Sequence, residues 1–181
     1  RVSNHHILQA PGALFPLLCV EDELERERLF NVFWNVGTKH QASFTKTILP
    51  MYLPQGIWPE SVSYSFMPHV PMILNIVDRI KPELNVASDY KHILEGSFIF
   101  PNLKNPNGTY VRYGDSKRLN EGSDEFYRFI MNMAERNEFN DLMEQAEITL
   151  KQYYNSVGGY VPTPQNSLYD HGKSLELFWG M

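Results

Sequence analysis

The spacing of apolar residues predicts a chain built mainly from helices. Four stretches carry apolar residues at intervals of three and four, which is the spacing of one face of an α-helix. Asp22 with Glu25 forms a helix-starting pair, Gly37 ends the same segment, and Ser123 caps a later one. The four stripes are Leu29, Val32, Phe33 and Val36; Val70, Ile73, Leu74, Val77 and Ile80; Phe126, Phe129, Ile130 and Met133; and Phe139, Leu142, Met143, Ala146 and Leu150.

Weaker periodic patterns indicate further helices over about residues 5–18, 41–49 and 89–98 and from Ser167 onward. Proline and glycine at positions 11, 12 and 16 are expected to break the first of these, because proline lacks the N–H that a helix interior needs. Alternating β-branched and aromatic residues occur only briefly, around residues 109–113. We therefore expect a mainly α fold.

The helical stripes come in pairs separated by short turns, at Gly37 and around Asn137. Narrow stripes in antiparallel pairs are typical of stacked helical hairpins, which we expect to form a single α-helical domain over residues 1–181. Two long loops, at about residues 50–64 and 101–121, interrupt the hairpins. Binding and catalytic residues are concentrated in loops between packed helices, so we expect functional residues in these two loops.

The composition supports a folded domain and narrows its function. With 43% hydrophobic and 13% aromatic residues, the 181-residue chain can bury a core. Its formal net charge is −5, so no global positive field attracts nucleic acid, and no apolar run approaches the ~18 residues that span a bilayer. We expect no nucleic-acid partner and no membrane partner. The single Cys19 excludes a disulfide framework and a cysteine-based zinc site.

The two ends of the sequence suggest a longer protein. Arg1 is not an initiator methionine, and no signal peptide follows it. The last residues, Phe178-Trp179-Gly180-Met181, form an aromatic cluster of the kind that packs against another surface. We therefore expect a processed product or fragment with chain missing on both sides.

The first of four polar clusters is Asn4-His5-His6, just before the first expected helix. A capping asparagine with two ordinary surface histidines explains it equally well. Adjacent histidines point in different directions and do not chelate one metal together, and the sequence has no helical His-x-x-x-His spacing. We expect no metal in the site and no required cofactor, although a structural metal elsewhere in a longer protein stays open.

The second cluster joins Trp58 and Glu60 to Ser63-Tyr64-Ser65. Aromatic rings beside a carboxylate and a phenol suit carbohydrate binding, since sugar rings stack on Trp and Tyr. A packed loop with Glu60 at a helix N-terminus is the alternative.

Two basic clusters complete the set. One is the run from Tyr113 to Arg118, which contains Gly114-Asp115-Ser116 and has a plain Gly-Asp turn as its alternative. The other is Lys39-His40 with Lys46, which we interpret as a solvated helix face.

In this order the clusters resemble the heparinase II/III-like polysaccharide lyases, which include related alginate lyases. The resemblance rests on the segment from Asn4 to Ala10, the segment from Gly56 through Trp58 and Glu60 to Tyr64, and the Gly-Asp-Ser loop. It implies an incomplete (α/α) toroid whose β-sandwich domain lies outside this sequence. It also implies β-elimination on a uronic-acid-containing polysaccharide, either heparin- or heparan sulfate-like or alginate-like.

The residues present suit that chemistry. The C5 proton of a uronate leaves only if the neighbouring carboxylate charge is neutralised, which Asn4 with His5 or His6 can do. A phenol near C5 can act as base, acid or both, and Tyr64 is the candidate that the resemblance supports, with Tyr52 as a competitor. The resemblance also offers His5 or His6 as the base for the other epimer.

The other candidates bind or orient the substrate. Glu60 is more suited to orienting a neighbour than to carrying a proton, and Trp58 and Tyr113 offer aromatic faces. The loop around Asp115 brings basic groups for an anionic chain, with arginine favouring bidentate geometry. These groups are Arg112, Lys117 and Arg118.

Two other functions stay open. A toroid glycoside hydrolase would use Glu60 and Asp115 as acid and base. A helical scaffold without enzymatic activity would bind glycans through its aromatic loops. The resemblance further implies a bacterial periplasmic or secreted protein.

Overall fold

A computed structural model describes residues 5–65, 68–103, 105–106, 109, 111–114 and 124–156. Within these residues the fold is mainly α, as the sequence predicts, and it contains no strand longer than a single bridge. The α-helices are α1 (His5–Leu18), α2 (Glu23–Asn31), α3 (Phe44–Thr47), α4 (Val62–Ser65), α5 (His69–Ile80), α6 (Val86–Asp89), α7 (Lys91–Gly96), α8 (Asp124–Arg136) and α9 (Asn140–Ser156). A π-helical turn, η1 (Val32–Val36), and the 3₁₀ segments η2 (Leu49–Met51), η3 (Pro82–Leu84) and η4 (Ser97–Leu103) join them. Closure into a toroid stays a prediction.

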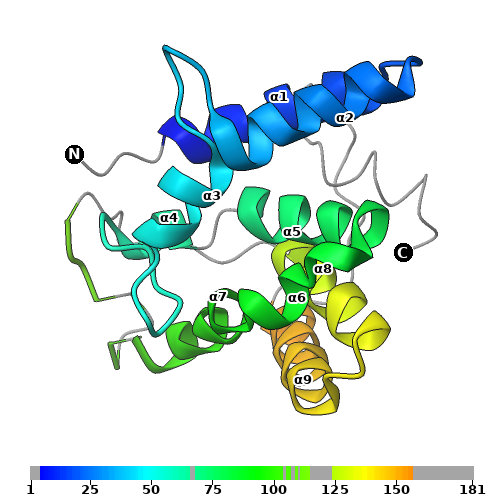
Figure 1. Cartoon of the computed structure of the whole chain (residues 1–181). Helices are drawn as coiled ribbons and strands as arrows, with labels where there is room; N and C mark the ends of the chain where they lie inside the picture. The colour runs from blue at the N-terminus through cyan, green and yellow to red at the C-terminus, as the bar shows by residue number, and fades with distance from the viewer. Residues whose placement is uncertain are drawn as a thin grey trace.

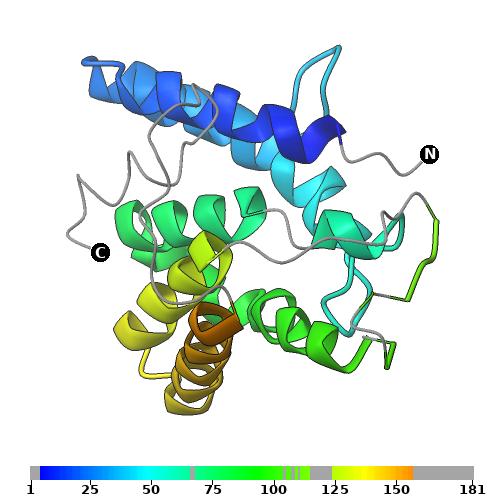
Figure 2. The same ribbon diagram turned by 180° about the vertical axis from the view of Figure 1, so that it is seen from behind.

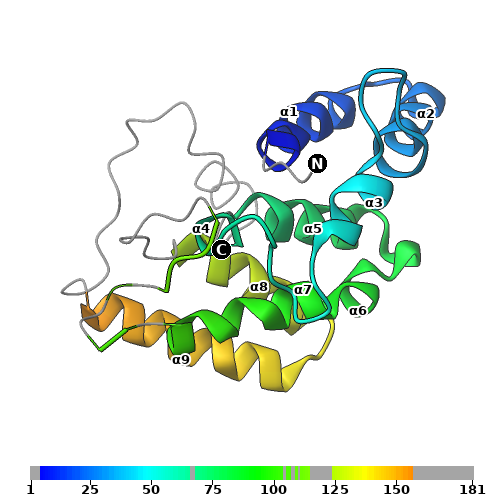
Figure 3. The ribbon, with the colours of Figure 1, turned by 90° about the vertical axis from the view of Figure 1, so that its left-hand side faces the viewer.

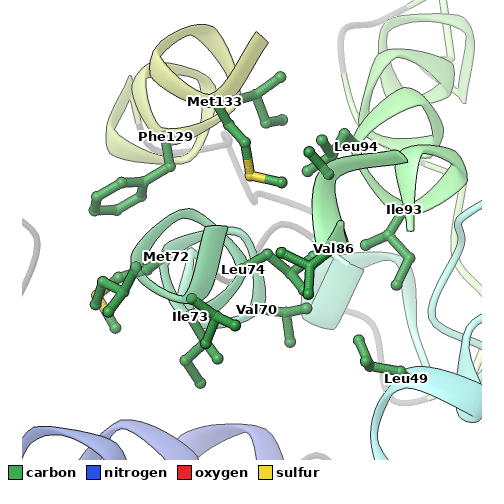
Figure 4. Close-up of a cluster of buried hydrophobic side chains, with 14 of the residues drawn as sticks. Leu49, Val70, Met72, Ile73, Leu74, Val86, Ile93, Leu94, Phe129 and Met133 are labelled. Carbon is green, nitrogen blue, oxygen red and sulfur yellow. The ribbon is translucent and has the colours of Figure 1, made fainter. Parts of the chain in front are cut away.

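Helix α5 forms the centre of the core. Helices α1 and α2 lie on one side of it, and α8 and α9 lie on the other (Figure 1). Its predicted stripe is wholly buried apart from Ile80 at the end, and Met72, Asn75, Ile76 and Asp78 on its other faces are buried too. Side chains from α6, α7 and α8 converge on it (Figure 4). A helix covered on all sides fixes the positions of the loops that precede and follow it.

Helix α1 runs unbroken through Pro11 and Pro16, so the expected break is wrong. Its buried face explains why the helix persists. The side chains of Ile7, Ala10 and Leu14 are at most 1% exposed, and α1 packs against α5. Burial of such a face contributes several kcal/mol and outweighs the hydrogen bonds that the prolines remove.

The segment after Asp22 is helical as expected, and the Asp22 side chain accepts a hydrogen bond from the backbone N–H of Glu25 at 2.9 Å. The buried residues, however, are Phe30 and Trp34, whose rings stack at 5.9 Å, while Val36 of the predicted stripe is 58% exposed. The predicted stripe is therefore confirmed in part: Leu29 and Phe33 are partly buried and pack against the core, while the most deeply buried face is the neighbouring one.

The C-terminal hairpin is confirmed for α8 and α9, which pack side by side (Figure 2). The turn between them carries Glu138 with a φ of 57°. At this turn, Arg136 forms an ion pair with Asp78 of α5 at 2.8 Å and donates to the backbone carbonyl of Asn75 at 3.2 Å. Asn137 donates to the same Asp78 carboxylate at 3.0 Å, so a polar network ties the hairpin to the central helix.

The weaker helices differ from expectation in length. The segment at 41–49 contains only the short helix α3, which is followed by η2 around Pro50. The segment at 89–98 spans the end of α6, the whole of α7 and the start of η4, with Tyr90 between α6 and α7. Ser123 and the segment from Ser167 lie outside the described residues. In the described part of the chain, no helix combines the length and apolar character that a bilayer crossing requires.

Candidate functional site

The two long loops meet in space. Ser61 pairs with Gly114 in an antiparallel bridge, and the Tyr113 hydroxyl donates to the backbone carbonyl of Trp58 at 2.9 Å. Figure 3 shows the segment before Gly114 beside α4. Gly114 has a φ of +56°, and a Cβ there would lie 1.8 Å from the Glu60 carbonyl oxygen, so this close approach requires glycine. The structure therefore joins the second and third sequence clusters into one site.

Trp58 supports this site from inside. Its side chain is 0% exposed, and its ring meets the Tyr52 ring edge-on at 5.3 Å. Its backbone N–H donates to Ser65 Oγ at 2.9 Å. The expectation that Trp58 presents a stacking face to a sugar is therefore wrong for this conformation, because no face of the ring is accessible.

Glu60 is held by that buried ring. The indole Nε1–H of Trp58 donates to Glu60 Oε2 at 3.2 Å, and the Glu60 side chain is partly buried. A carboxylate fixed by an indole N–H has a defined orientation, and the role of Glu60 in orienting a neighbour stays a prediction.

Tyr64 lies on α4, three residues after the bridge at Ser61. Its side chain is partly buried and packs against the core, and Ser65 beside it is buried. The phenol is therefore held between the core and the surface by a helix of four residues.

The start of the same loop is anchored to α7. Gly56 has a φ of +74°, and a Cβ on it would lie 1.9 Å from the backbone oxygen of His92. A Cβ on Gly96 would lie 2.4 Å from the Gln55 carbonyl oxygen. Two glycines thus allow loop and helix backbones to touch, a contact that sequence analysis missed, although the glycine at 56 was its signal.

Tyr113 has a supporting role that the sequence did not reveal. Burial raises the pKa of its hydroxyl, and the hydrogen bond with the Ser65 side chain offsets part of that rise. Because the hydroxyl is engaged by Trp58 and Ser65, it ties the two loops together. Arg112 beside it is exposed. Asp115, Lys117 and Arg118 lie outside the described residues, so their predicted binding roles stay predictions.

The histidines lie at the start of α1. His5 is exposed, whereas His6 is partly buried, and its Nδ1 atom has no hydrogen-bond partner among the described residues. Asn4 lies outside those residues. The start of α1 and helix α4 lie at the same end of the molecule (Figures 1 and 2). Their convergence on one groove stays a prediction.

Among the described residues, no three His, Cys, Asp or Glu side chains lie close enough together to hold a metal ion. The described part of the site offers a phenol, an oriented carboxylate and an exposed guanidinium.

Comparison with known families decides the class of the chain. Residues 54–181, from the start of the loop that holds Trp58 and Glu60, match the family described as "Endo-acting ulvan lyase 2nd domain". The chain belongs to this family. Helices α1 to α3 precede the matched region.

A curated relative covers both parts. The endo-acting ulvan lyase of Formosa agariphila is 52% identical over 179 residues, which is 99% of this chain. The chain spans only 22% of that relative's length. No solved structure matches this chain. The resemblance found in the sequence thus reached the class of polysaccharide lyases, and the family that matches is named for ulvan lyases, not for heparinase II/III-like enzymes.

Proposed function

We propose that this chain is part of a polysaccharide lyase that cleaves a uronate-containing polysaccharide by β-elimination, and that the polysaccharide is ulvan. The observation that carries the proposal is the 52% identity over nearly the whole chain with an endo-acting ulvan lyase. The name of that relative favours ulvan over the heparin-like and alginate-like substrates that the sequence pattern led us to expect.

The reaction needs two things from the protein. As the C5 proton leaves, negative charge builds on the uronate carboxylate, so neutral or positive donors must meet it. The bond from C4 to the glycosidic oxygen breaks as the C4–C5 double bond forms, and the leaving oxygen takes a proton. The product is an unsaturated uronate and a free hydroxyl.

Tyr64 is the group we assign to the proton transfers. Its support is positional: it follows directly from the loop in which Glu60 is oriented and Ser61 is paired with the second loop. Tyr52, the competing tyrosine, is 8% exposed, and burial raises the pKa of its hydroxyl well above the ordinary value of 10.0. A phenol enclosed in this way cannot reach a polysaccharide, so the structure favours Tyr64.

Donors to the substrate carboxylate complete the proposal. We assign Asn4 with His5 or His6 to the charge on the reacting uronate, and exposed Arg112 to a carboxylate along the chain, because a guanidinium binds carboxylates in bidentate geometry. Glu60 orients the loop. A glycoside hydrolase that uses Glu60 and Asp115 is disfavoured by the engagement of Glu60 with the Trp58 indole.

The rest of the proposal concerns the protein around this chain. We infer that the helices belong to an (α/α) toroid that packs on a β-sandwich domain, and that the protein works in the bacterial periplasm or outside the cell, where a polysaccharide is met. The relative is more than four times as long as the matched region, which leaves room for such domains.

A chimera tests the function in its full context. The matching 179 residues of the Formosa agariphila enzyme are replaced by this chain, and absorbance near ~230 nm is followed on ulvan, heparin and alginate, since the conjugated product absorbs there. We expect a rise on ulvan. No rise on ulvan, from a folded chimera whose unmodified parent is active, would refute the function.

Two matched variants test the residue assignment. Tyr64→Phe should lower kcat by about 100-fold or more, as loss of a general acid or base does. Tyr52→Phe removes the same oxygen from the neighbouring tyrosine and should leave kcat within about threefold. Equal activity of the two variants would remove Tyr64 from the mechanism while leaving the function in place.

A further inference from the structure

One stretch of this acidic chain lacks acidic residues. Residues 28–59 contain no Asp or Glu but hold Arg28, Lys39 and Lys46, together with His40. Lys39, His40 and Lys46 are exposed, and within the described part of the chain none of them forms an ion pair. Other cations in the same part, such as Lys81 and Lys151, are paired with carboxylates at 2.6 Å.

Lys39 and His40 sit at the tip of a tightly bonded turn, residues 38–41, which we call the cationic turn. The Thr38 N–H donates to the Gln41 carbonyl at 2.6 Å, and Thr38 Oγ1 accepts from the backbone N–H groups of His40 and Gln41 at 3.2 and 3.0 Å. Gly37 enters the turn with a φ of +82°, and a Cβ there would lie 2.8 Å from the Ser43 nitrogen. The turn projects from the end of η1 (Figure 1) and is held in shape before any ligand arrives.

The acidic residues near this turn in sequence are too far away to neutralise it. Glu25 and Glu27 lie in the first five residues of α2, and the turn follows the opposite end of the same continuous helix (Figure 1). Gly37 follows Glu27 by ten positions. At a rise of 1.5 Å per residue they lie about 15 Å apart, beyond the screening length of about 8 Å at physiological ionic strength. The acidic side chains thus lie near the first end of this continuous helix, and the cationic turn follows its last residue.

An apolar pocket of about 190 Å³ lies beneath the cationic turn. The turn supplies Thr38 and Gln41 to its rim, and α1 supplies Ala10 and Ala13 to its wall. Phe33 and Phe44 also line it, with ring centres 5.5 Å apart. Lys46 follows Phe44 by two residues, which turns it about 200° around the helix axis, so it lies on the opposite side of α3 and outside the pocket.

We propose that the cationic turn and the pocket beneath it form a binding site for anionic residues of the polysaccharide, separate from the loop that carries Tyr64. The inference rests on the proposed function, which supplies the ligand class. An apolar pocket with a polar rim, next to the exposed Lys39 of the turn, matches a uronate ring, which has C–H faces and a carboxylate edge. This site holds the polysaccharide away from the bond that breaks, so it raises affinity for long chains and leaves the chemical step alone.

The test measures binding of the 181-residue chain to immobilised ulvan. Lys39→Ala should weaken binding by about 3- to 5-fold, since an exposed charge contact contributes up to about 1 kcal/mol. It should also reduce the dependence of affinity on salt. Lys151→Ala is the matched control, because it removes the same charge from a cation that the structure pairs with Glu147. The control should bind within about twofold of the unmodified chain.

Ulvan whose carboxylates have been reduced to alcohols separates the possible outcomes. If Lys39→Ala and Lys151→Ala bind this reduced polymer equally, the difference seen on native ulvan comes from carboxylate binding at the turn. Equal binding of both variants to native ulvan overturns the site while leaving the proposed function intact. No binding of the unmodified chain to ulvan overturns both the site and the proposed substrate.

Discussion

Tyr113→Phe tests whether one hydrogen bond holds the two loops of the site together. The substitution keeps the ring and removes only the hydroxyl, which donates to the Trp58 carbonyl at 2.9 Å and contacts the Ser65 side chain. Trp58 is fully buried, so its carbonyl has little access to water as a replacement donor. The lost bond therefore leaves an acceptor unsatisfied.

The expected loss of stability follows from the burial of the Trp58 carbonyl. A typical intramolecular hydrogen bond contributes about 1 kcal/mol net, and a buried group left unsatisfied costs about 1–3 kcal/mol. Tyr113 itself is only partly buried, so water can reach part of the gap, and we expect a loss of about 1–2 kcal/mol in the free energy of unfolding. For a domain of this size that lowers Tm by about 3–6 °C.

Thermal unfolding followed by circular dichroism measures the effect. Tyr52→Phe is the matched control, because Tyr52 packs on the same Trp58 ring at 5.3 Å and its hydroxyl makes no hydrogen bond to another described residue. The control should keep its Tm within about 1 °C, because it breaks no such bond. An unchanged Tm in Tyr113→Phe, or an equal fall in both variants, would show that the hydroxyl does not join the loops.

Three further predictions concern stability. Burial raises the pKa of Tyr52, so its contribution to the free energy of unfolding is complete below pH 10 and is lost as the pH rises above 10. Urea midpoints measured from pH 8 to 11 should therefore fall more steeply in the unmodified chain than in Tyr52→Phe. Arg136→Ala removes the ion-pair partner of the Asp78 carboxylate, which is 8% exposed and keeps the hydrogen bond from Asn137. It should lower the free energy of unfolding, measured in urea, by about 3 kcal/mol, whereas Lys151→Ala should change it by less than about 0.5 kcal/mol. Gly114→Ala should destabilise the chain, because its Cβ would lie 1.8 Å from the Glu60 oxygen; Gly12→Ala, with open space in the middle of α1, should stabilise it by about 0.5–1 kcal/mol, and thermal unfolding compares the two.

The long helices could be predicted because their periodic apolar residues enter the core. The stripe of α5 and that of α8 are buried as expected, since in each the apolar spacing of three and four coincides with the face that meets a neighbour. The segment around Phe30 and Trp34 was predicted only in part, because its most deeply buried face is not the predicted stripe. When two faces of a helix are apolar, spacing alone cannot tell which face meets the core, because that depends on elements distant in sequence.

The site could be predicted only as separate clusters. Trp58, Glu60 and Tyr64 were predicted as one cluster because aromatic rings beside a carboxylate and a phenol suit carbohydrate binding. The antiparallel bridge from Ser61 to Gly114 joins positions 53 residues apart, and no local pattern indicates such a pairing. The sequence left two interpretations of Trp58 open, a sugar-binding face and a packed loop. The structure shows the packed loop, and the residue pattern alone could not decide between them, because an exposed and a buried tryptophan can stand in the same local sequence.

The proposed catalytic tyrosine therefore depends on contacts that its own helix does not supply. Helix α4 has four residues, far fewer than the roughly 12–15 that an isolated helix needs for stability in water. Its position is set by the bridge at Ser61, by the Tyr113 hydrogen bond and by the close contact of Gly56 with α7. Substitutions at these supports should act on kcat more than on KM, because a small displacement of the phenol weakens proton transfer while leaving the charged binding groups in place.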